Sequence, residues 1–318
     1  MLSDAVPAEI EPGSSVRAAN AARARVLGVV WVLVSGVAFS AKAILVKLAY
    51  RDDVGAVSLL ALRFSFSAPF FALGAYFSGS RKGTLTRRDA LATVGLGVLG
   101  YYAASLTDFI GLRYISAGLE RLILFVYPTL VVLMEAWLFQ VKIGRRQVLA
   151  LVVTYGGIGL AFRGELGNYG SDVARGAAWV FVCALTYALY LLGAGRMVPK
   201  LGAQRFTSLA LLAAAAAVLI HAGLSGAKIL GLPARVYGIG LLMALVATVL
   251  PAFLLARGIA LLGSGPAAIV STIGPVSTIV LAYFFLQEPI SLTEIFGTAL
   301  VIFGAALVAS GGKARANA

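Results

Sequence analysis

Ten long apolar runs, separated by short polar stretches, dominate the sequence. A helix that crosses a bilayer needs roughly 20 mainly apolar residues. Hydrophobic residues fill 60% of the 318 positions and charged residues only 12%, whereas about 25% of the residues in a soluble domain are charged. A soluble protein of this composition would lack the polar side chains to cover its surface. The sequence therefore predicts an all-α polytopic membrane protein that is embedded in a lipid bilayer.

The apolar runs give the approximate bounds of ten transmembrane helices. The predicted spans are 26–48, 55–77, 89–110, 114–139, 147–163, 174–195, 202–223, 235–261, 265–287 and 292–310. The polar residues 1–25 are expected to form a disordered cytoplasmic tail, and residues 311–318 a second, short cytoplasmic tail.

The basic residues predict the orientation. The formal net charge is +13, but Lys and Arg cluster between the apolar runs, so we expect them to face lipid head groups and not nucleic acid. Fifteen of them fall in segments on the side of the N-terminus, and six in the alternate segments: Arg51, Arg113, Arg163, Arg175, Lys228 and Arg235. This excess predicts a multi-pass protein of the inner (plasma) membrane with both termini in the cytoplasm.

An internal repeat organises the ten spans. At an offset of 147 residues, Gly118 lies over Gly265, Pro128 over Pro275 and Gly157 over Gly304. At an offset of 148, Trp31 lies over Trp179. Because each copy holds an odd number of spans, five, the second copy must enter the membrane from the opposite side. We expect two inverted five-helix repeats around a central cavity.

The residues that carry a family resemblance lie in both copies. In the first they are Leu62-Arg63-Phe64, Ser116-Ala117-Gly118, Pro128 and Gly156-Gly157-Ile158-Gly159; in the second they are Gly263-Ser264-Gly265, Pro275, Leu286-Gln287-Glu288-Pro289, Gly297 and Gly304. The chain resembles the ten-helix EamA type of the drug/metabolite transporter superfamily. The resemblance implies one EamA repeat over residues 26–163 and another over residues 174–310.

The resemblance also implies a transporter of small metabolites that needs no cofactor. Members of the family include exporters of amino acids and other metabolites. The family usually has a Gly-Glu pair after the fourth helix of each half, where this chain has Gln140-Val141 and Gln287-Glu288. Because the acidic residue is missing from the first copy, we assign Glu288 no substrate role.

Ionisable residues at membrane depth are costly and are candidates for function. Lys42, Arg63, Glu120 and Arg121 are expected roughly 10 Å below the outer surface, at about 1.5 Å per helical residue, and Asp108 nearer the outer end of its helix. We expect Lys42, Arg63, Glu120 and Arg121 to bind substrate, and Glu120 or Asp108 to exchange a proton. The alternative is a structural ion-pair network, for example of Arg63 or Arg121 with Glu120 or Asp108.

Tyrosines and prolines inside the spans are further candidates. Tyr101, Tyr102, Tyr187 and Tyr190 lie in mid-helix, where a hydroxyl needs a partner or a wet cavity, so we expect them to line the substrate path. The alternative is packing with an internal hydrogen bond. Pro128 and Pro275 match across the repeat and are predicted hinges, with fixed kinks as the alternative.

The sequence thus predicts a secondary transporter of a small metabolite, such as an amino acid or related compound, with export as the expected direction. The single Cys183 and single His221 allow no disulfide and no evident metal site, and we expect no catalytic residues. A membrane scaffold or sensor without transport is one rival; an intramembrane enzyme acting on lipid-linked substrates is another. The sequence does not indicate the oligomeric state.

Overall fold

The computed structural model describes residues 14–78, 85–138, 140, 144–262, 266–267 and 270–311, and these ranges contain helices and loops without a β-strand. In the N-terminal half the helices are α1 (Ser14–Tyr50), α2 (Ala56–Phe77), α3 (Arg87–Gly97), the π-helical η1 (Val98–Ala103), α4 (Ala104–Gly111), α5 (Ala117–Leu124), α6 (Tyr127–Leu138) and α7 (Arg145–Tyr169). In the C-terminal half they are α8 (Asp172–Leu201), α9 (Ala203–Leu224), α10 (Ala234–Ala244), the π-helical η2 (Leu245–Val249), α11 (Leu250–Leu262), α13 (Ile273–Leu286) and α14 (Leu292–Gly311).

Most of the predicted spans have a matching helix. Eight helical segments among the described residues are long and apolar enough to cross a membrane, and two shorter apolar helices follow, Ile273–Leu286 and Leu292–Leu307. The second to eighth segments begin within three residues of their predicted starts. The ninth predicted span is described only in part, because residues 265, 268 and 269 lie outside the described ranges. The Gly263-Ser264-Gly265 motif lies outside them as well. The chain is a polytopic membrane protein.

The prediction of a disordered tail over residues 1–25 is wrong for its second part. Helix α1 begins at Ser14, so residues 14–25 are helical and continue into the first span. The segment is rich in Ala and Arg, both strong helix formers. The first span is already helical, so extending its helix into this segment needs no new nucleation. Residues 1–13 and 312–318 lie outside the described part of the chain.

Prolines interrupt three of the spans. A proline has no N–H for the carbonyl four residues before it and crowds that carbonyl. Accordingly α5 ends at Leu124, four residues before Pro128. Helix α13 begins at Ile273, two residues after Ser271, which lies four residues before Pro275. Pro251 follows the π-helical η2, which contains Ala247 four residues before it. The breaks thus lie where a backbone hydrogen bond is missing.

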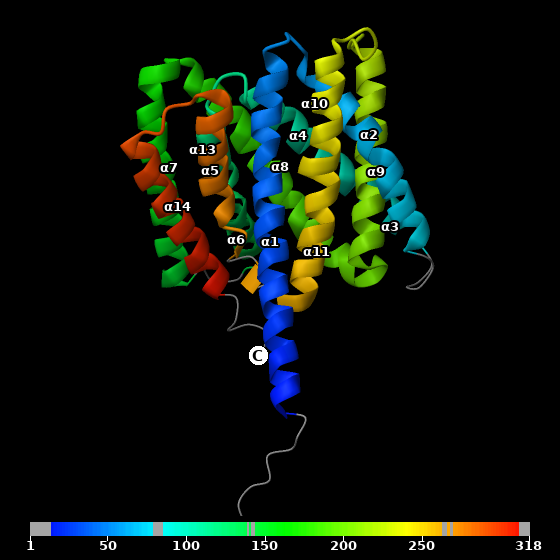
Figure 1. The fold of residues 1–318 in the computed structure, drawn as a ribbon, viewed down its shortest axis with the longest axis vertical. Coiled ribbons are helices and arrows are strands. Elements are labelled where there is room, and N and C mark those ends of the chain that lie inside the picture. The colour runs from blue at the N-terminus through cyan, green and yellow to red at the C-terminus, as the bar shows by residue number, and fades with distance from the viewer. Residues whose placement is uncertain are drawn as a thin grey trace, which may run out of the picture.

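The helices contact one another in pairs that join the two halves. Helix α1 packs against α11, α4 against α8, α2 against α9, and α7 against α14. Figure 1 shows α7 and α14 together at one side of the bundle and α2, α3 and α9 at the other. Helix α1 begins and helix α14 ends at the same end of the bundle, which we call the proximal end. The opposite, distal end is formed by the loops α1–α2, α4–α5, α7–α8, α9–α10 and α13–α14.

Glycines allow the closest of these approaches. A Cβ added at Gly157 of α7 would lie 2.7 Å from the Gly297 carbonyl oxygen of α14, and one at Gly297 would lie 2.6 Å from the Gly157 carbonyl oxygen. Small residues at such crossings let two backbones approach, which is a principal source of helix association in lipid. The α7–α14 contact therefore depends on these two glycines.

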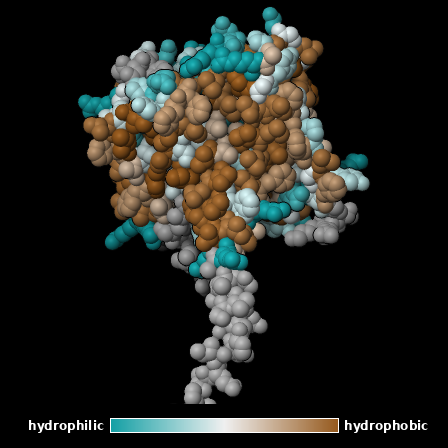
Figure 2. Space-filling view, viewed as in Figure 1, coloured by the Kyte–Doolittle hydropathy of each residue, from teal (hydrophilic) through white to brown (hydrophobic). Residues whose placement is uncertain are grey.

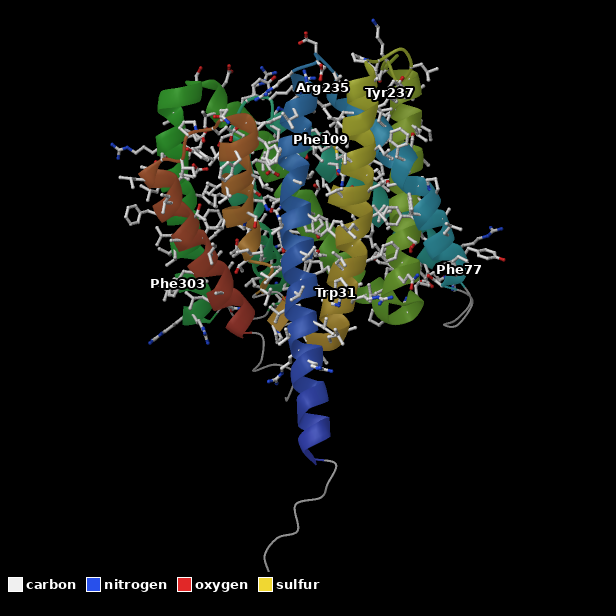
Figure 3. All side chains as sticks on the ribbon, viewed as in Figure 1. Trp31, Phe77, Phe109, Arg235, Tyr237 and Phe303 are labelled. Carbon is white, nitrogen blue, oxygen red and sulfur yellow. The ribbon has the colours of Figure 1, made fainter. Side chains whose placement is uncertain are left out.

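The surface has the pattern that a bilayer requires. On the face that Figure 2 shows, apolar residues form a broad band across the middle of the bundle, and polar residues gather toward its two ends. Phe77 and Phe303 are exposed on the outside of the bundle, whereas Phe109 is completely buried inside it (Figure 3). Large exposed apolar side chains are stable only against an apolar solvent, so the band marks the part of the surface that faces lipid.

The α7–α14 packing gives a first prediction. Leu at position 157 should force the two helices apart and cost about 1–3 kcal/mol, as overpacking of a tight interior usually does. The matched control is Gly159→Leu on the same helix, where an added Cβ has no neighbour within 4 Å. Thermal unfolding of the detergent-solubilised protein should show a lower Tm for Gly157→Leu only. Equal Tm values for the two variants would contradict this account of the packing.

Candidate functional site

A lysine and two carboxylates meet inside the bundle. The Lys42 Nζ of α1 lies 2.6 Å from Asp108 Oδ2 of α4 and 3.1 Å from Glu120 Oε1 of α5. The side chains of Lys42, Asp108 and Glu120 are 14%, 1% and 0% exposed. We call these three residues the Lys42 triad. The structure thus brings together Lys42, Asp108 and Glu120, all three of which the sequence had selected. The ion-pair alternative named Arg63 or Arg121 as the partner of the carboxylates, whereas the partner is Lys42.

Short-range geometry explains why these two carboxylates converge. Helices α4 and α5 are joined only by residues 112–116, so Asp108 in the last turn of α4 and Glu120 in the first turn of α5 lie close together. The Ser116 side chain caps α5 by accepting a hydrogen bond from the Leu119 N–H, which fixes where that first turn begins. A like-charged pair of this kind needs a cation to be stable at low dielectric constant.

The triad has unused capacity for binding. Asp108 Oδ1 and Glu120 Oε2 are both buried and have no hydrogen-bond partner. One ammonium faces two carboxylates, so an ionised triad carries one excess negative charge. A proton, or the cationic group of a ligand, would neutralise that charge and occupy a free oxygen.

Arg63 makes its direct contacts with hydroxyl groups and aromatic rings. Its guanidinium donates from Nε to Thr248 Oγ1 of η2 at 2.8 Å and from Nη1 to Ser105 Oγ of α4 at 3.4 Å. It also lies 5.9 Å from the centroid of the Phe109 ring. Among the described residues no carboxylate oxygen lies within 4.0 Å of it. Ser105 and Thr248 were not among the predicted site residues, because hydroxyl side chains are common in apolar helices.

Arg121 points away from the triad, toward α13. A Cβ added at Gly274 would lie 2.7 Å from Arg121 Nη2, so the glycine leaves space for the guanidinium. The Arg121 group lies 5.5 Å from the centroid of the Phe125 ring, and its Nε is buried without a hydrogen-bond partner. Adjacent residues on a helix point about 100° apart, which is why Glu120 and Arg121 do not share a partner.

Three of the four predicted tyrosines form one aromatic group. The hydroxyls of Tyr101 and Tyr190 are 3.0 Å apart, and Tyr187 stacks on Tyr190 with ring centroids 5.8 Å apart. Tyr127, which sequence reasoning did not select, packs edge-on against Tyr187 at 5.1 Å. Its position directly before Pro128 was the available signal. Tyr102 points elsewhere, because its hydroxyl lies 2.8 Å from His221 Nδ1 on α9.

Tyr101 lies in the π-helical segment η1. A π-helical turn inserts an extra residue in the helical repeat and so changes the direction of the side chains that follow it, a feature common at functional sites. Gly100 beside it lies directly against the Tyr190 ring, where an added Cβ would clash. The local geometry therefore serves the contact between Tyr101 and Tyr190.

Glu288 has a structural position near the distal end. Its Oε1 lies 2.8 Å from Lys47 Nζ, and its Oε2 accepts the Ala117 N–H at 3.0 Å. Glu165 likewise accepts a hydrogen bond from the Ser116 hydroxyl. Carboxylates are stabilising at a helix N-terminus, where free N–H groups and the helix dipole favour negative charge. Glu288 thus stabilises the start of α5, and we still assign it no substrate role.

A cavity of about 510 Å³ opens at the distal end, between the ends of α1, α4 and α13. None of the predicted site residues is among those that line it. The lining of a central cavity by the Lys42 triad, the arginines and the tyrosines therefore remains a prediction. No group of three His, Cys, Asp or Glu residues is placed to hold a metal ion among the residues that the structure describes.

Residues 26–163 and 174–310 each match the model of the EamA-like transporter family. The chain belongs to the EamA-like transporter family. Both copies of the family domain are present, so the family and the drug/metabolite transporter superfamily suggested by the sequence motifs are confirmed.

Curated relatives of this EamA-like protein are transporters by name. It is 29% identical over 291 residues to the uncharacterized transporter YcbK of Bacillus subtilis, a match that covers 87% of this chain and 90% of that one. It is 26% identical over 259 residues to the uncharacterized transporter YyaM of the same species, over 80% and 84% of the two chains. A solved crystal structure of a protein matches with a TM-score of 0.58 at 17% identity, over 90% of this chain and 97% of that one, which shows the fold alone.

The Lys42 triad gives a second prediction. Lys42→Met should leave two buried carboxylates without a cation and lower the free energy of unfolding by about 3–5 kcal/mol. The triple variant Lys42→Met/Asp108→Asn/Glu120→Gln removes the charges together and should recover much of that loss. Thermal unfolding of the three proteins in one detergent tests this. A triple variant less stable than Lys42→Met would show that the ion pairs are not what stabilises this part of the bundle.

Proposed function

We propose that this protein is a secondary transporter that moves a small polar or amphipathic metabolite across the inner membrane by alternating access. The observation that carries the proposal is the Lys42 triad, a group of charges buried within the spans with two carboxylate oxygens free. Charges at this depth are costly and are kept where they contact a substrate or an ion. Membership of the EamA-like family supports the transport function.

The charges favour a zwitterionic substrate, and an amino acid or related compound is the leading class. Arg63 and Arg121 have no carboxylate partner among the described residues, whereas the triad has a carboxylate in excess. A substrate carboxylate can bind a guanidinium while its amine binds Glu120 or Asp108. Tyr101, Tyr187 and Tyr190 would line the path, and Tyr102, bonded to His221, would lie at its edge.

We infer that the two halves form an inverted repeat of five helices each. The π-helical segments η1 and η2 begin at Val98 and Leu245, 147 residues apart. Gln140 and Gln287, at the same offset, both have a left-handed backbone with φ of 53° and 60°. Each also donates its side-chain N–H to the carbonyl three residues earlier. Equal local geometry at one offset supports two copies of one fold.

The reciprocal contacts support the same inference. Gly111 of α4 lies against Val180 of α8, and Gly258 of α11, at the same offset of 147, lies against Val32 of α1. In a pseudo-symmetric pair, each half can adopt the conformation of the other, which exchanges outward-open and inward-open states. Both termini would lie in the cytoplasm, on the proximal side, and export would run toward the distal side.

The energy for transport would come from a gradient, with Glu120 or Asp108 as the proton carrier. The triad can accept a proton on a free carboxylate oxygen without losing the contact with Lys42. We expect no cofactor.

A scaffold or sensor without transport is the competing function that the tight packing of Glu120 favours, and a transport assay separates the two.

Glu120→Gln tests the proton-coupling role. The amide keeps the size of the side chain but cannot carry a proton. Accumulation driven by a pH gradient should therefore be abolished in proteoliposomes that take up metabolites from an external mixed pool. Glu135→Gln is the matched control, because Glu135 lies on α6 outside the triad. The amounts transported with and without the gradient are measured by mass spectrometry. Unchanged gradient-driven accumulation by Glu120→Gln would contradict coupling through Glu120, and no transport by the wild type would favour the scaffold.

Pro128 and Pro275 are the proposed hinges. In Pro128→Ala an N–H is restored at the break between α5 and α6, so the two helices can join and the bend should stiffen. We expect a transport rate about tenfold lower with little change in substrate affinity. The control is Pro69→Ala, because Pro69 lies inside the continuous helix α2. Initial rates over a range of substrate concentrations separate the transport rate from the affinity. Wild-type rates for both Pro128→Ala and the corresponding variant Pro275→Ala would indicate fixed kinks.

A further inference from the structure

The cavity at the distal end is separate from the proposed substrate site. It lies where the last turn of α1, the α4–α5 loop and the α13–α14 loop meet, and its volume is about 510 Å³. Pockets for small molecules usually measure about 300–1,000 Å³. We call it the distal vestibule, and its polar lining consists of Lys47, Tyr50, Arg51, Asp53, Arg113 and Glu288.

One pair of charges in the distal vestibule is already neutralised. Lys47 Nζ lies 2.8 Å from Glu288 Oε1, and the other Glu288 oxygen accepts the Ala117 N–H. Both oxygens of Glu288 are therefore occupied. This pair does not offer a charge to a ligand, and the remaining charges of the lining are those of Arg51, Arg113 and Asp53.

The two arginines of the vestibule make only long hydrogen bonds to backbone carbonyl oxygens. Arg113 donates to the Val54 carbonyl oxygen at 3.3 Å and Arg51 to the Leu286 carbonyl oxygen at 3.4 Å. In the described part of the chain neither guanidinium has a carboxylate oxygen within 4.0 Å. A guanidinium has five N–H donors arranged to match a carboxylate or a phosphate. Most of these donors remain available to a ligand.

Arg113 is also held in position before a ligand arrives. Its guanidinium lies over the Tyr50 ring, 4.8 Å from the ring centroid. The Tyr50 hydroxyl donates to the Phe109 carbonyl oxygen at 2.6 Å, which fixes the ring beneath the arginine. A group fixed in this way loses little conformational entropy when it binds.

We propose that the distal vestibule is an anion-binding site, in which Arg113 and Arg51 bind the carboxylate or phosphate group of a small organic anion. Two cations without an acidic partner outnumber the one remaining acid, Asp53, so an anion is favoured over a cation. The group can belong to a free metabolite or to a lipid head group. The site goes beyond the proposed transport function, since binding here requires no movement of the bundle and no contact with the Lys42 triad.

The experiment uses the full chain in nanodiscs, titrated by isothermal calorimetry with succinate and with inorganic phosphate. In neutral phosphatidylcholine we expect saturable binding of at least one probe to the wild type. Arg113→Gln should weaken it by about tenfold or more, because it removes a bidentate, charge-assisted contact, and Arg51→Gln should weaken it less. Arg113→Lys, which keeps the charge, should lie between Arg113→Gln and the wild type.

Arg235→Gln is the matched control. Arg235 is at the same end of the bundle (Figure 3) but does not line the vestibule, and it lies 3.7 Å from Asp52. Its loss should leave binding of both probes unchanged. A thermal unfolding scan of every variant identifies any that has failed to fold. An Arg→Gln variant that fails is replaced by the Arg→Lys variant at the same position.

Nanodiscs of anionic phosphatidylglycerol distinguish the two sources of the anion. Weaker binding of the probes there than in phosphatidylcholine indicates that a head group occupies the vestibule, and equal binding indicates a free metabolite; both outcomes support an anion site. Absence of saturable binding to the wild type in phosphatidylcholine, or wild-type affinity in the Arg51→Gln/Arg113→Gln double variant, would overturn the proposal. Because no transport is measured, either result leaves the transport proposal to the Glu120→Gln assay.

Discussion

The ion pairs of Lys42 with Asp108 and Glu120 are the interaction on which the rest of the first half depends. A carboxylate in the apolar interior is strongly stabilised by a cation in direct contact with it. The ion pairs join α1 to α4 and to α5, whose short connection places the two carboxylates close together. The same arrangement leaves two carboxylate oxygens without a partner, because one ammonium cannot satisfy two carboxylates. Stability and the capacity to bind a ligand therefore come from one arrangement.

In the second half an uncharged residue takes the place of Lys42. Tyr190 occupies the repeat position of Lys42, at an offset of 148 residues, and its hydroxyl bonds to that of Tyr101. Its ring stacks on Phe206, with centroids 5.9 Å apart. A tyrosine can bury its ring in an apolar bundle and still provide one polar group. The structure thus holds a charged group, the Lys42 triad, and an aromatic group formed by Tyr101, Tyr127, Tyr187 and Tyr190.

The bundle combines close glycine contacts with segments in which backbone hydrogen bonds are missing. Glycines bring α7 within direct backbone contact of α14, and neither helix carries a residue of the Lys42 triad. The breaks before Pro128 and Pro275 and the π-helical segments lie on other helices. Missing backbone hydrogen bonds lower the cost of bending. These close glycine contacts and the breaks thus lie on different helices.

The sequence by itself determined the class of the fold, the approximate helix bounds, the family and the candidate charges. Apolar length and charge at membrane depth are local properties, so Lys42, Asp108, Glu120 and the tyrosines could be selected without coordinates. Only the tertiary structure decided that Lys42, and neither arginine, binds the two carboxylates, that Tyr102 turns to His221, and that Tyr127, Ser105 and Thr248 join the site. It also showed that residues 14–25 are helical and that Arg113 rests on Tyr50. Partner choice depends on how helices distant in sequence are rotated and packed, and residue type alone does not contain that information.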